Sequence, residues 1–351
     1  MIHGGNVWQG NSPAQWLDYS ANIRPEGAPD WVKDALMGAM DKLSYYPDQE
    51  MKRARQSLSA YLDLPAEYVL PTAGGISAID LATHLPGTGM LQFTPCFAEY
   101  SMLSGNRGKS VGNIPLLTGR HIIGDPAEQA KGRLFEGCTV WLCNPLNPIG
   151  CAFTLEQIEK LLMLVEEKHG WLVVDEAFIE YCPDHSAIGL IKNHERLLVT
   201  GSMTKILGIP GVRLGYLCAQ PQVLAEIGKY QLPWEVSCFA EAVLCALPKH
   251  KVDVQAYCEV NACRREHLRK GLEGLGVYVY PSEAAFVLAD FGKPVHGLIE
   301  KLKERGILVR QCMNFESVND GCHLRLAVKD ESSNDRLIEA MREEMICAEN
   351  L

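Results

Sequence analysis

Short apolar runs alternate with helical patterns over the first two thirds of the chain. Residues 139–143 and 171–174 have the composition of buried strands, and a helical spacing of apolar positions covers residues 155–169 between them. Strands that alternate with amphipathic helices, here from about residue 29 to residue 234, are typical of a mostly parallel α/β sheet. This part of the chain is therefore predicted to form a large α/β lobe.

The last third of the chain follows a different pattern. A long helical stretch covers residues 235–275, and three short strand-like segments follow it, at residues 277–280, 285–290 and 324–328. This pattern predicts a smaller α+β lobe, which the amino-terminal segment is expected to join. The length of 351 residues also exceeds the roughly 250–300 residues at which single cores stop growing. We therefore place a large domain at residues 28–234 and a small domain at residues 1–27 and 235–351.

One lysine lies in an unusual setting. Lys205 follows Ser202 within the glycine-rich residues 201–215, which also contain Arg213. A lysine amine that is at times neutral can condense with an aldehyde cofactor, and hydroxyl, backbone N–H and guanidinium groups can bind the phosphate of such a cofactor. Taken alone, the segment is equally compatible with a surface lysine in a glycine-rich loop.

Two further polar residues follow the predicted strands. Asn147 lies in a turn with two prolines just after residues 139–143, and Asp175 comes directly after residues 171–174. Because ligands of open parallel sheets bind outside the carboxyl ends of the strands, both side chains and the Lys205 loop are expected in one crevice. There a carboxylate can keep a pyridine nitrogen protonated, and an amide can donate to a ring oxygen. Singly, Asp175 also fits a helix N-cap and Asn147 a turn, but the combination favours a pyridoxal phosphate site.

These motifs, in this order, resemble those of the fold-type I pyridoxal phosphate enzymes, the aspartate aminotransferase superfamily. Within it, the chain is most similar to the threonine-phosphate decarboxylases of cobalamin biosynthesis, and next to the histidinol-phosphate aminotransferases. Four further segments carry the likeness, at residues 3–6, 18–25, 70–75 and 307–315. The resemblance covers nearly the whole chain. It implies an α/β fold, with a mostly parallel sheet of the seven-stranded type in a large domain and a smaller α+β domain.

The resemblance also implies contacts with the cofactor, pyridoxal 5'-phosphate. Lys205 is expected to bind it covalently, with Asp175 at the pyridine nitrogen and Asn147 at the 3-oxygen. Contacts with the phosphate are implied for a glycine turn that opens a helix, for the Lys205 loop and for a tyrosine that crosses a homodimer interface: Ala73, Gly74, Gly75, Ser202, Arg213 and Tyr46. An ordinary helix start is the alternative for the glycine turn.

Two phenylalanines are expected to lie near the cofactor ring. Phe97 is expected to stack on it, with a buried core phenylalanine as the alternative. Phe178 stands where many related aminotransferases carry a tyrosine, so the hydroxyl that would contact the 3-oxygen is missing. Asn147 is then expected to act alone at that oxygen.

Substrate contacts are implied for a further group of residues. Arg325 lies where the family holds the substrate α-carboxylate, a group that suits a planar guanidinium; an edge position facing solvent is the alternative. A phosphorylated substrate needs a second anion site, for which Arg310, Asn22, Ser20 and His3 are the candidates. A disordered tail is the alternative for His3.

The implied function is decarboxylation of L-threonine O-3-phosphate, or of a close phosphorylated amino acid, to an aminoalkyl phosphate for corrinoid biosynthesis. The first alternative is a class I/II aminotransferase, such as one that acts on histidinol phosphate. Both reactions use the same residues and differ in which substrate bond is aligned for cleavage. The second alternative is a non-catalytic binding protein that has kept the fold.

Composition excludes several other classes of partner. A formal net charge of -10 argues against nucleic acid or an anionic membrane as the main partner. The 13 cysteines form no Cys-x-x-Cys pair, which favours reduced thiols over disulfides or a zinc site. No signal pattern and no long apolar window is present, so we expect a soluble cytoplasmic protein. The resemblance implies that it is a homodimer and acts on a small molecule.

Overall fold

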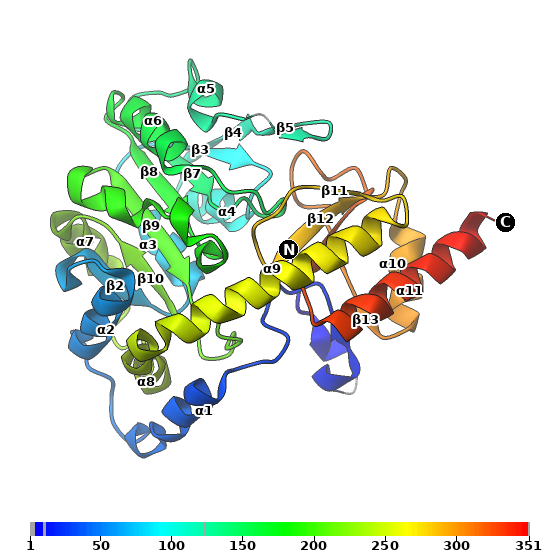
Figure 1. The fold of residues 1–351 in the computed structure, drawn as a ribbon. Helices are drawn as coiled ribbons and strands as arrows, with labels where there is room; N and C mark the ends of the chain where they lie inside the picture. The colour runs from blue at the N-terminus through cyan, green and yellow to red at the C-terminus, as the bar shows by residue number, and fades with distance from the viewer. Residues whose placement is uncertain (1–3, 10–11, 123, 350–351) are drawn as a thin grey trace.

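A seven-stranded sheet forms the centre of the larger part of the molecule (Figure 1). The computed structural model describes residues 4–9, 12–122 and 124–349. In spatial order the strands are β2 (Val69–Thr72), β10 (Gly215–Cys218), β9 (Leu197–Ser202), β8 (Trp171–Asp175), β7 (Thr139–Cys143), β3 (Gly89–Thr94) and β4 (Ser110–Pro115). Strand β10 is antiparallel to both neighbours, and the other pairings are parallel. The predicted fold class is therefore confirmed.

Helices pack around this sheet. Every residue of β7 and β9 is buried, as expected for parallel strands that are covered on both faces. The helices of this part are α1 (Asp30–Met37), α2 (Lys52–Leu62), α3 (Gly75–Ala82), α4 (Glu99–Asn106), α5 (Pro126–Ala130), α6 (Leu155–Glu166), α7 (Pro221–Ile227) and α8 (Cys238–Ala246). Helix α6 begins at a capping box formed by Thr154 and Gln157 and ends at Glu166 rather than at residue 169, because His169 is left-handed (φ 47°).

A second, four-stranded antiparallel sheet lies in the carboxyl-terminal part. Its order is β11 (Tyr278–Val279), β12 (Phe286–Asp290), β15 (His323–Ala327) and β14 (Arg310–Gln311). The helices here are α9 (Lys251–Glu273), α10 (His296–Glu304) and α11 (Glu331–Glu349). Helix α9 spans both parts of the molecule (Figure 1): Val254 belongs to the main hydrophobic core, whereas Leu268 and Leu272 belong to a second core.

The amino-terminal segment pairs with the carboxyl-terminal part. Strand β1 (Leu17–Asp18) is parallel to β13 (Ile307–Leu308), and Tyr19 lies in the second core. A short hairpin joins β5 (Leu117–Thr118) and β6 (His121–Ile122). Within the residues described, no helix combines the length and apolar character that a bilayer crossing needs. The domain boundaries given above stay predictions.

Candidate active site

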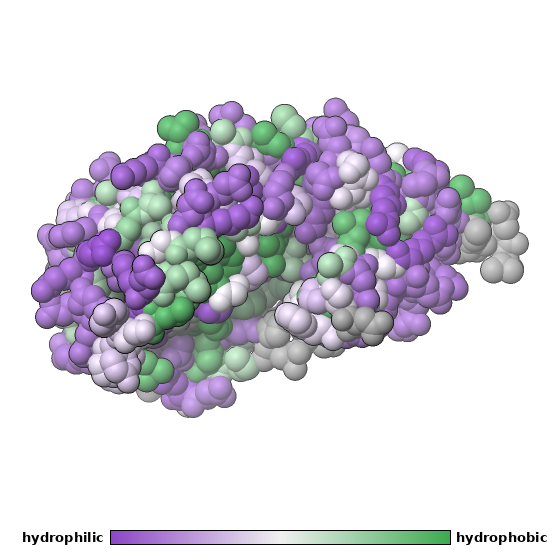
Figure 2. Space-filling model, turned by 90° about the horizontal axis from the view of Figure 1, so that it is seen from below, coloured by the Kyte–Doolittle hydropathy of each residue, from purple (hydrophilic) through white to green (hydrophobic). Residues whose placement is uncertain are grey.

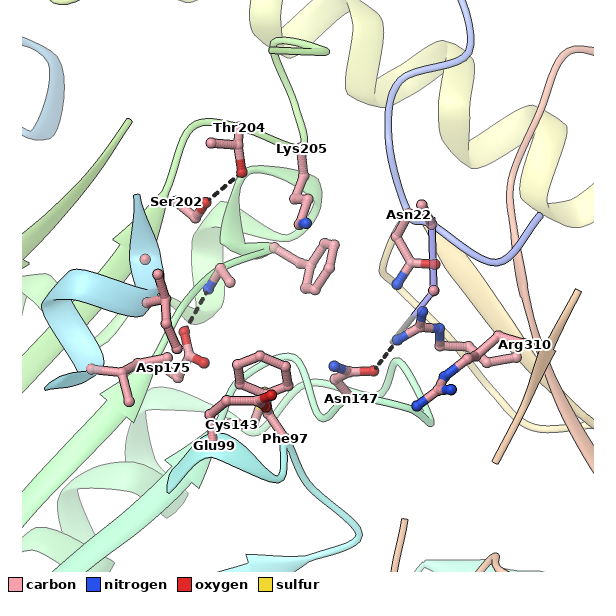
Figure 3. A pocket seen from close by; sticks show the side chains of 18 of the residues that line it. Asn22, Phe97, Glu99, Cys143, Asn147, Asp175, Ser202, Thr204, Lys205 and Arg310 are labelled. Carbon is pink, nitrogen blue, oxygen red and sulfur yellow. Dashed lines mark hydrogen bonds between the residues drawn. The ribbon is translucent and has the colours of Figure 1, made fainter. Parts of the chain in front are cut away.

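A cavity of about 260 Å³ lies at the carboxyl ends of the central parallel strands. Asn147 follows β7, Asp175 ends β8, and Ser202 ends β9 three residues before Lys205. All four residues line this cavity, and Figure 3 shows their side chains around it. Motifs that are far apart in the sequence therefore meet at one place, because parallel strands bring their carboxyl ends to the same edge.

The surroundings of Lys205 lower the pKa of its amine. Desolvation in the cavity, together with the nearby charges of Arg325 and Arg213, lowers the pKa of this amine to about 8, and the charge of Asp175 opposes this shift. A lowered pKa increases the neutral fraction of the amine near physiological pH, and only the neutral amine is nucleophilic. The setting of Lys205 therefore differs from that of a surface lysine.

The carboxylate of Asp175 is buried at the bottom of the site. Its Oδ2 accepts a hydrogen bond from the hydroxyl of Tyr100, and its Oδ1 accepts bonds from Ala177 N at 3.2 Å and from Thr200 Oγ1 at 3.3 Å. Burial raises the pKa of Asp175, and these donors oppose that shift. A buried carboxylate is suited to hold a cationic nitrogen of a ligand.

Tyr100 is a site residue that the sequence analysis missed. It lies on α4, and its ring stacks on Trp141 of β7 at a centroid distance of 4.7 Å. The sequence signal for it was its position three residues after Phe97. Phe97 itself lines the cavity and meets the Tyr100 ring edge-on at 5.9 Å. Cys143, Phe178 and Glu99 complete this side of the wall.

The start of α3 offers an anion site. Gly75 and Ile76 open this helix and line the cavity, and the first N–H groups of a helix have no partner within it. Gly74 has a left-handed conformation (φ +84°), and a Cβ there would lie 2.6 Å from Nη2 of Arg213. The guanidinium therefore packs directly over the glycine turn. Ser202 Oγ and Thr204 Oγ1, 2.8 Å apart, supply hydroxyls beside it.

Two of the predicted phosphate contacts are otherwise engaged. The N–H of Ala73 donates to Glu235 Oε1 at 3.3 Å, and the N–H of Gly74 donates to Thr72 O at 2.8 Å. Gly75 and Ile76 line the cavity, so their N–H groups are the candidates for contacts with the phosphate.

Arg325 crosses from the second sheet into the cavity. Its Nη1 donates to Asn147 Oδ1 at 2.9 Å and its Nη2 donates to Ser20 O at 2.8 Å. It is 8% exposed on β15, which lies between β12 and β14. The alternative of a solvent-facing edge arginine is therefore wrong.

The second predicted anion site lies beside Arg325. Arg310 of β14 is 5% exposed and stands opposite Arg325 in the antiparallel register. Its guanidinium donates to Asn314 Oδ1. Asn22 and Ser20 line the same cavity, but the Ser20 hydroxyl already donates to Asp18 Oδ1 at 2.6 Å.

One predicted residue lies away from the cavity, and another falls outside the residues that the structure describes. Tyr46 is 81% exposed, contacts the Trp234 ring at 4.8 Å and is absent from the cavity wall. His3 lies outside the described residues, so its role stays a prediction.

Comparison with known proteins identifies the family of this chain. The family model for class I and II aminotransferases matches residues 15–341. The chain belongs to this family. Relatives named for both groups of enzymes that the sequence motifs resemble match the chain, and the predicted resemblance is confirmed.

Individual relatives carry two different names. The chain is 32% identical to a putative threonine-phosphate decarboxylase of Caldanaerobacter subterraneus subsp. tengcongensis, over 97% of this chain and 93% of the relative. It is 30% identical to the threonine-phosphate decarboxylase of Salmonella typhimurium, over 97% and 95%. The solved histidinol-phosphate aminotransferase of Clostridium acetobutylicum is 29% identical, with a TM-score of 0.86 over 95% of this chain and 99% of that one.

A further solved structure contains a bound cofactor. Histidinol-phosphate aminotransferase of Sinorhizobium meliloti, in complex with pyridoxal-5'-phosphate, has a TM-score of 0.83 over 92% of this chain and 89% of that one, at 20% identity. At this identity the likeness shows a shared fold.

Proposed function

We propose that this protein is a lyase that removes the carboxyl group of L-threonine O-3-phosphate, or of a close phosphorylated amino acid, and yields an aminoalkyl phosphate for corrinoid biosynthesis. The observation that carries the proposal is the pair of opposed guanidiniums, Arg310 and Arg325. Among the described residues, their hydrogen-bond acceptors are the neutral oxygens of Asn147, Ser20 and Asn314. Two buried cations without a bonded carboxylate suit a substrate that has both a carboxylate and a phosphate.

The cofactor is pyridoxal 5'-phosphate, and the residues of the cavity fit it. A lysine amine of lowered pKa, a buried carboxylate and a glycine turn covered by Arg213 lie around one cavity. Lys205 would hold the cofactor aldehyde, Asp175 its ring nitrogen, and the start of α3 with Ser202 its phosphate. When bound, the cofactor supplies an electron-accepting ring that stabilises negative charge at the substrate α-carbon.

The residues of the chain then divide the remaining tasks. Arg325 binds the substrate carboxylate and Arg310 the phosphate, so that the substrate is held at both ends. The bond from the α-carbon to the carboxyl carbon breaks, CO2 leaves, and the α-carbon takes up a proton. Lys205 Nζ, with a pKa lowered to about 8, can carry that proton near neutral pH.

An aminotransferase is the second candidate. It is supported by the 29% identity and the TM-score of 0.86 to the Clostridium acetobutylicum enzyme, and its chemistry needs the same lysine and carboxylate. The decarboxylase is favoured because the two relatives of 32% and 30% identity bear that name.

One assay separates the candidates. Purified protein with bound cofactor is incubated with phosphothreonine, with and without 2-oxoglutarate. Release of CO2 without the oxo acid is the expected result, whereas glutamate formation that depends on it would identify an aminotransferase. Binding of phosphothreonine with no product in either case would indicate a non-catalytic protein.

A homodimer is part of the same proposal. Exposed apolar side chains come from the α1 region and from residues 230–234: Met37, Met40, Leu43, Tyr45, Tyr46, Tyr230, Leu232 and Trp234. Figure 2 views the molecule from the side on which α1 lies in Figure 1, and it shows apolar residues gathered around a hollow. Apolar patches of this kind mark protein contacts, and a second copy would cover this one and bring Tyr46 toward the neighbouring cavity.

A further inference from the structure

Helix α3 has no side-chain cap of its own. Its N-cap residue is Gly74, which makes no side-chain capping bond. A carboxylate that is 162 residues distant in the sequence supplies bonds at this point. Glu235 Oε1 accepts from Ala73 N at 3.3 Å, and both Glu235 oxygens accept from Ser77 Oγ, at 3.0 and 2.9 Å.

Glu235 is itself held in place. Gln231 donates from Nε2 to Glu235 Oε1 at 2.8 Å and to Pro71 O at 2.7 Å. Pro71 lies on β2 and Ser77 lies on α3. The side chains of Gln231 and Glu235, bonded to each other, therefore connect strand β2 before the glycine turn with helix α3 after it.

One side of the glycine turn therefore contacts Glu235, and the other side lines the cavity. Ala73 N and Ser77 Oγ face Glu235, whereas Gly75 and Ile76 line the cavity. Glycine allows more backbone conformations than other residues, so the contacts of Glu235 add to the internal bond from Gly74 N to Thr72 O in holding one conformation of the turn.

We propose that Glu235 is a positioning residue for the cofactor phosphate. By bonding the outer side of the turn, it directs the N–H groups of Gly75 and Ile76 into the cavity, where an anion is to bind. This inference rests on the cofactor site of the proposed function and is independent of which phosphorylated amino acid is converted.

The test is cofactor affinity, measured without turnover. Apoprotein of each variant is titrated with pyridoxal 5'-phosphate and followed by absorbance, and the rate of cofactor loss on dilution is recorded. We expect Glu235→Ala to weaken binding at least 10-fold. Glu235→Gln retains an amide oxygen that can accept from Ala73 and Ser77, so it should stay within about 3-fold of the parent. Glu226→Ala, which removes an exposed carboxylate paired with Lys229 on the surface, is the matched control and should bind like the parent.

Several outcomes would overturn the inference. Parent-like affinity of Glu235→Ala would do so, and so would a Glu235→Gln variant as weak as Glu235→Ala, because charge rather than hydrogen-bond acceptance would then be responsible. If Glu235→Ala fails to fold by circular dichroism, Ser77→Ala decides, since it removes the helix end of the same contact. It should weaken cofactor binding about 3-fold, and unchanged affinity would contradict the proposal. A parent protein that binds the cofactor but does not decarboxylate phosphothreonine would overturn the proposed function alone.

Discussion

Arg325 donates from Nη1 to Oδ1 of Asn147 at 2.9 Å, which joins the second sheet to the loop after β7 across 178 residues of sequence. One residue of this pair belongs to the expected substrate end and the other to the expected cofactor end. This bond orients the guanidinium, so its remaining donors can meet a carboxylate at little entropic cost.

Arg325→Lys should weaken use of carboxylate-bearing substrates. A lysine lacks the planar fork and cannot bond Asn147, Ser20 O and a carboxylate in the same geometry. Loss of a charged hydrogen bond costs about 1.5–3 kcal/mol, equivalent to a fall in kcat/KM of about 10- to 150-fold. The fall should appear in KM for phosphothreonine, with cofactor affinity retained. Arg269→Lys, in an exposed ion pair with Glu266 on α9, is the control.

Covalent loading of the apoprotein should depend on pH through Lys205. Its pKa is lowered from 10.5 to about 8, so the amine is protonated below pH 8 and neutral above it. Because the neutral form attacks the aldehyde, the loading rate should rise roughly tenfold per pH unit below pH 8 and level off above about pH 9. The adduct is measured by borohydride reduction and mass analysis of the peptide. A flat profile, or an adduct that persists in Lys205→Ala, would contradict the assignment.

Tyr100→Phe should disturb Asp175 without removing it. The variant loses the donor to Oδ2, one of the bonds that hold the pKa of Asp175 down against burial. That pKa should rise, so the acid side of the profile of kcat/KM against pH should move to higher pH. An unsatisfied buried group costs about 1–3 kcal/mol, and kcat/KM at neutral pH should fall about 5- to 150-fold. Tyr278→Phe, whose hydroxyl lies on the exposed surface, should leave the profile unchanged.

The sequence pattern predicted the site residues that lie at or just after the ends of strands. The strand at 139–143 was predicted with the bounds of β7, and Asp175 proved to be the last residue of β8. Tyr100 and Glu235 could not be found in this way. Their contacts with Asp175 and Ala73 span 75 and 162 residues, and nothing in their sequence neighbours indicates such a partner.

Helix α11 was also missed. Its buried residues, among them Leu337 and Met341, lie between many charged ones, so the apolar stripe becomes clear only when α9 packs against it. The role predicted for Tyr46 requires a second copy of the chain, so a single chain does not test it. His3 and the domain boundaries likewise stay predictions.

Tyr46 should act in the cavity of a neighbouring subunit. The first measurement is the molar mass in solution, which light scattering should give as twice the mass of the 351-residue chain. Leu232→Asp should shift this mass toward that of the monomer, because it places a charge in the apolar patch. Tyr46→Ala should lower cofactor affinity, because the cavity would lose one donor to the phosphate.

Mixing two defective variants gives the decisive result. Lys205→Ala protein keeps Tyr46, and Tyr46→Ala protein keeps Lys205, so a mixed dimer has one cavity with both residues. After exchange of subunits, activity should exceed that of either variant alone and approach a quarter of the parent value, because about half of the dimers are mixed and each has one intact cavity. If mixing restores no activity although exchange is verified by mass, Tyr46 serves its own subunit or none, and the assignment across the interface fails.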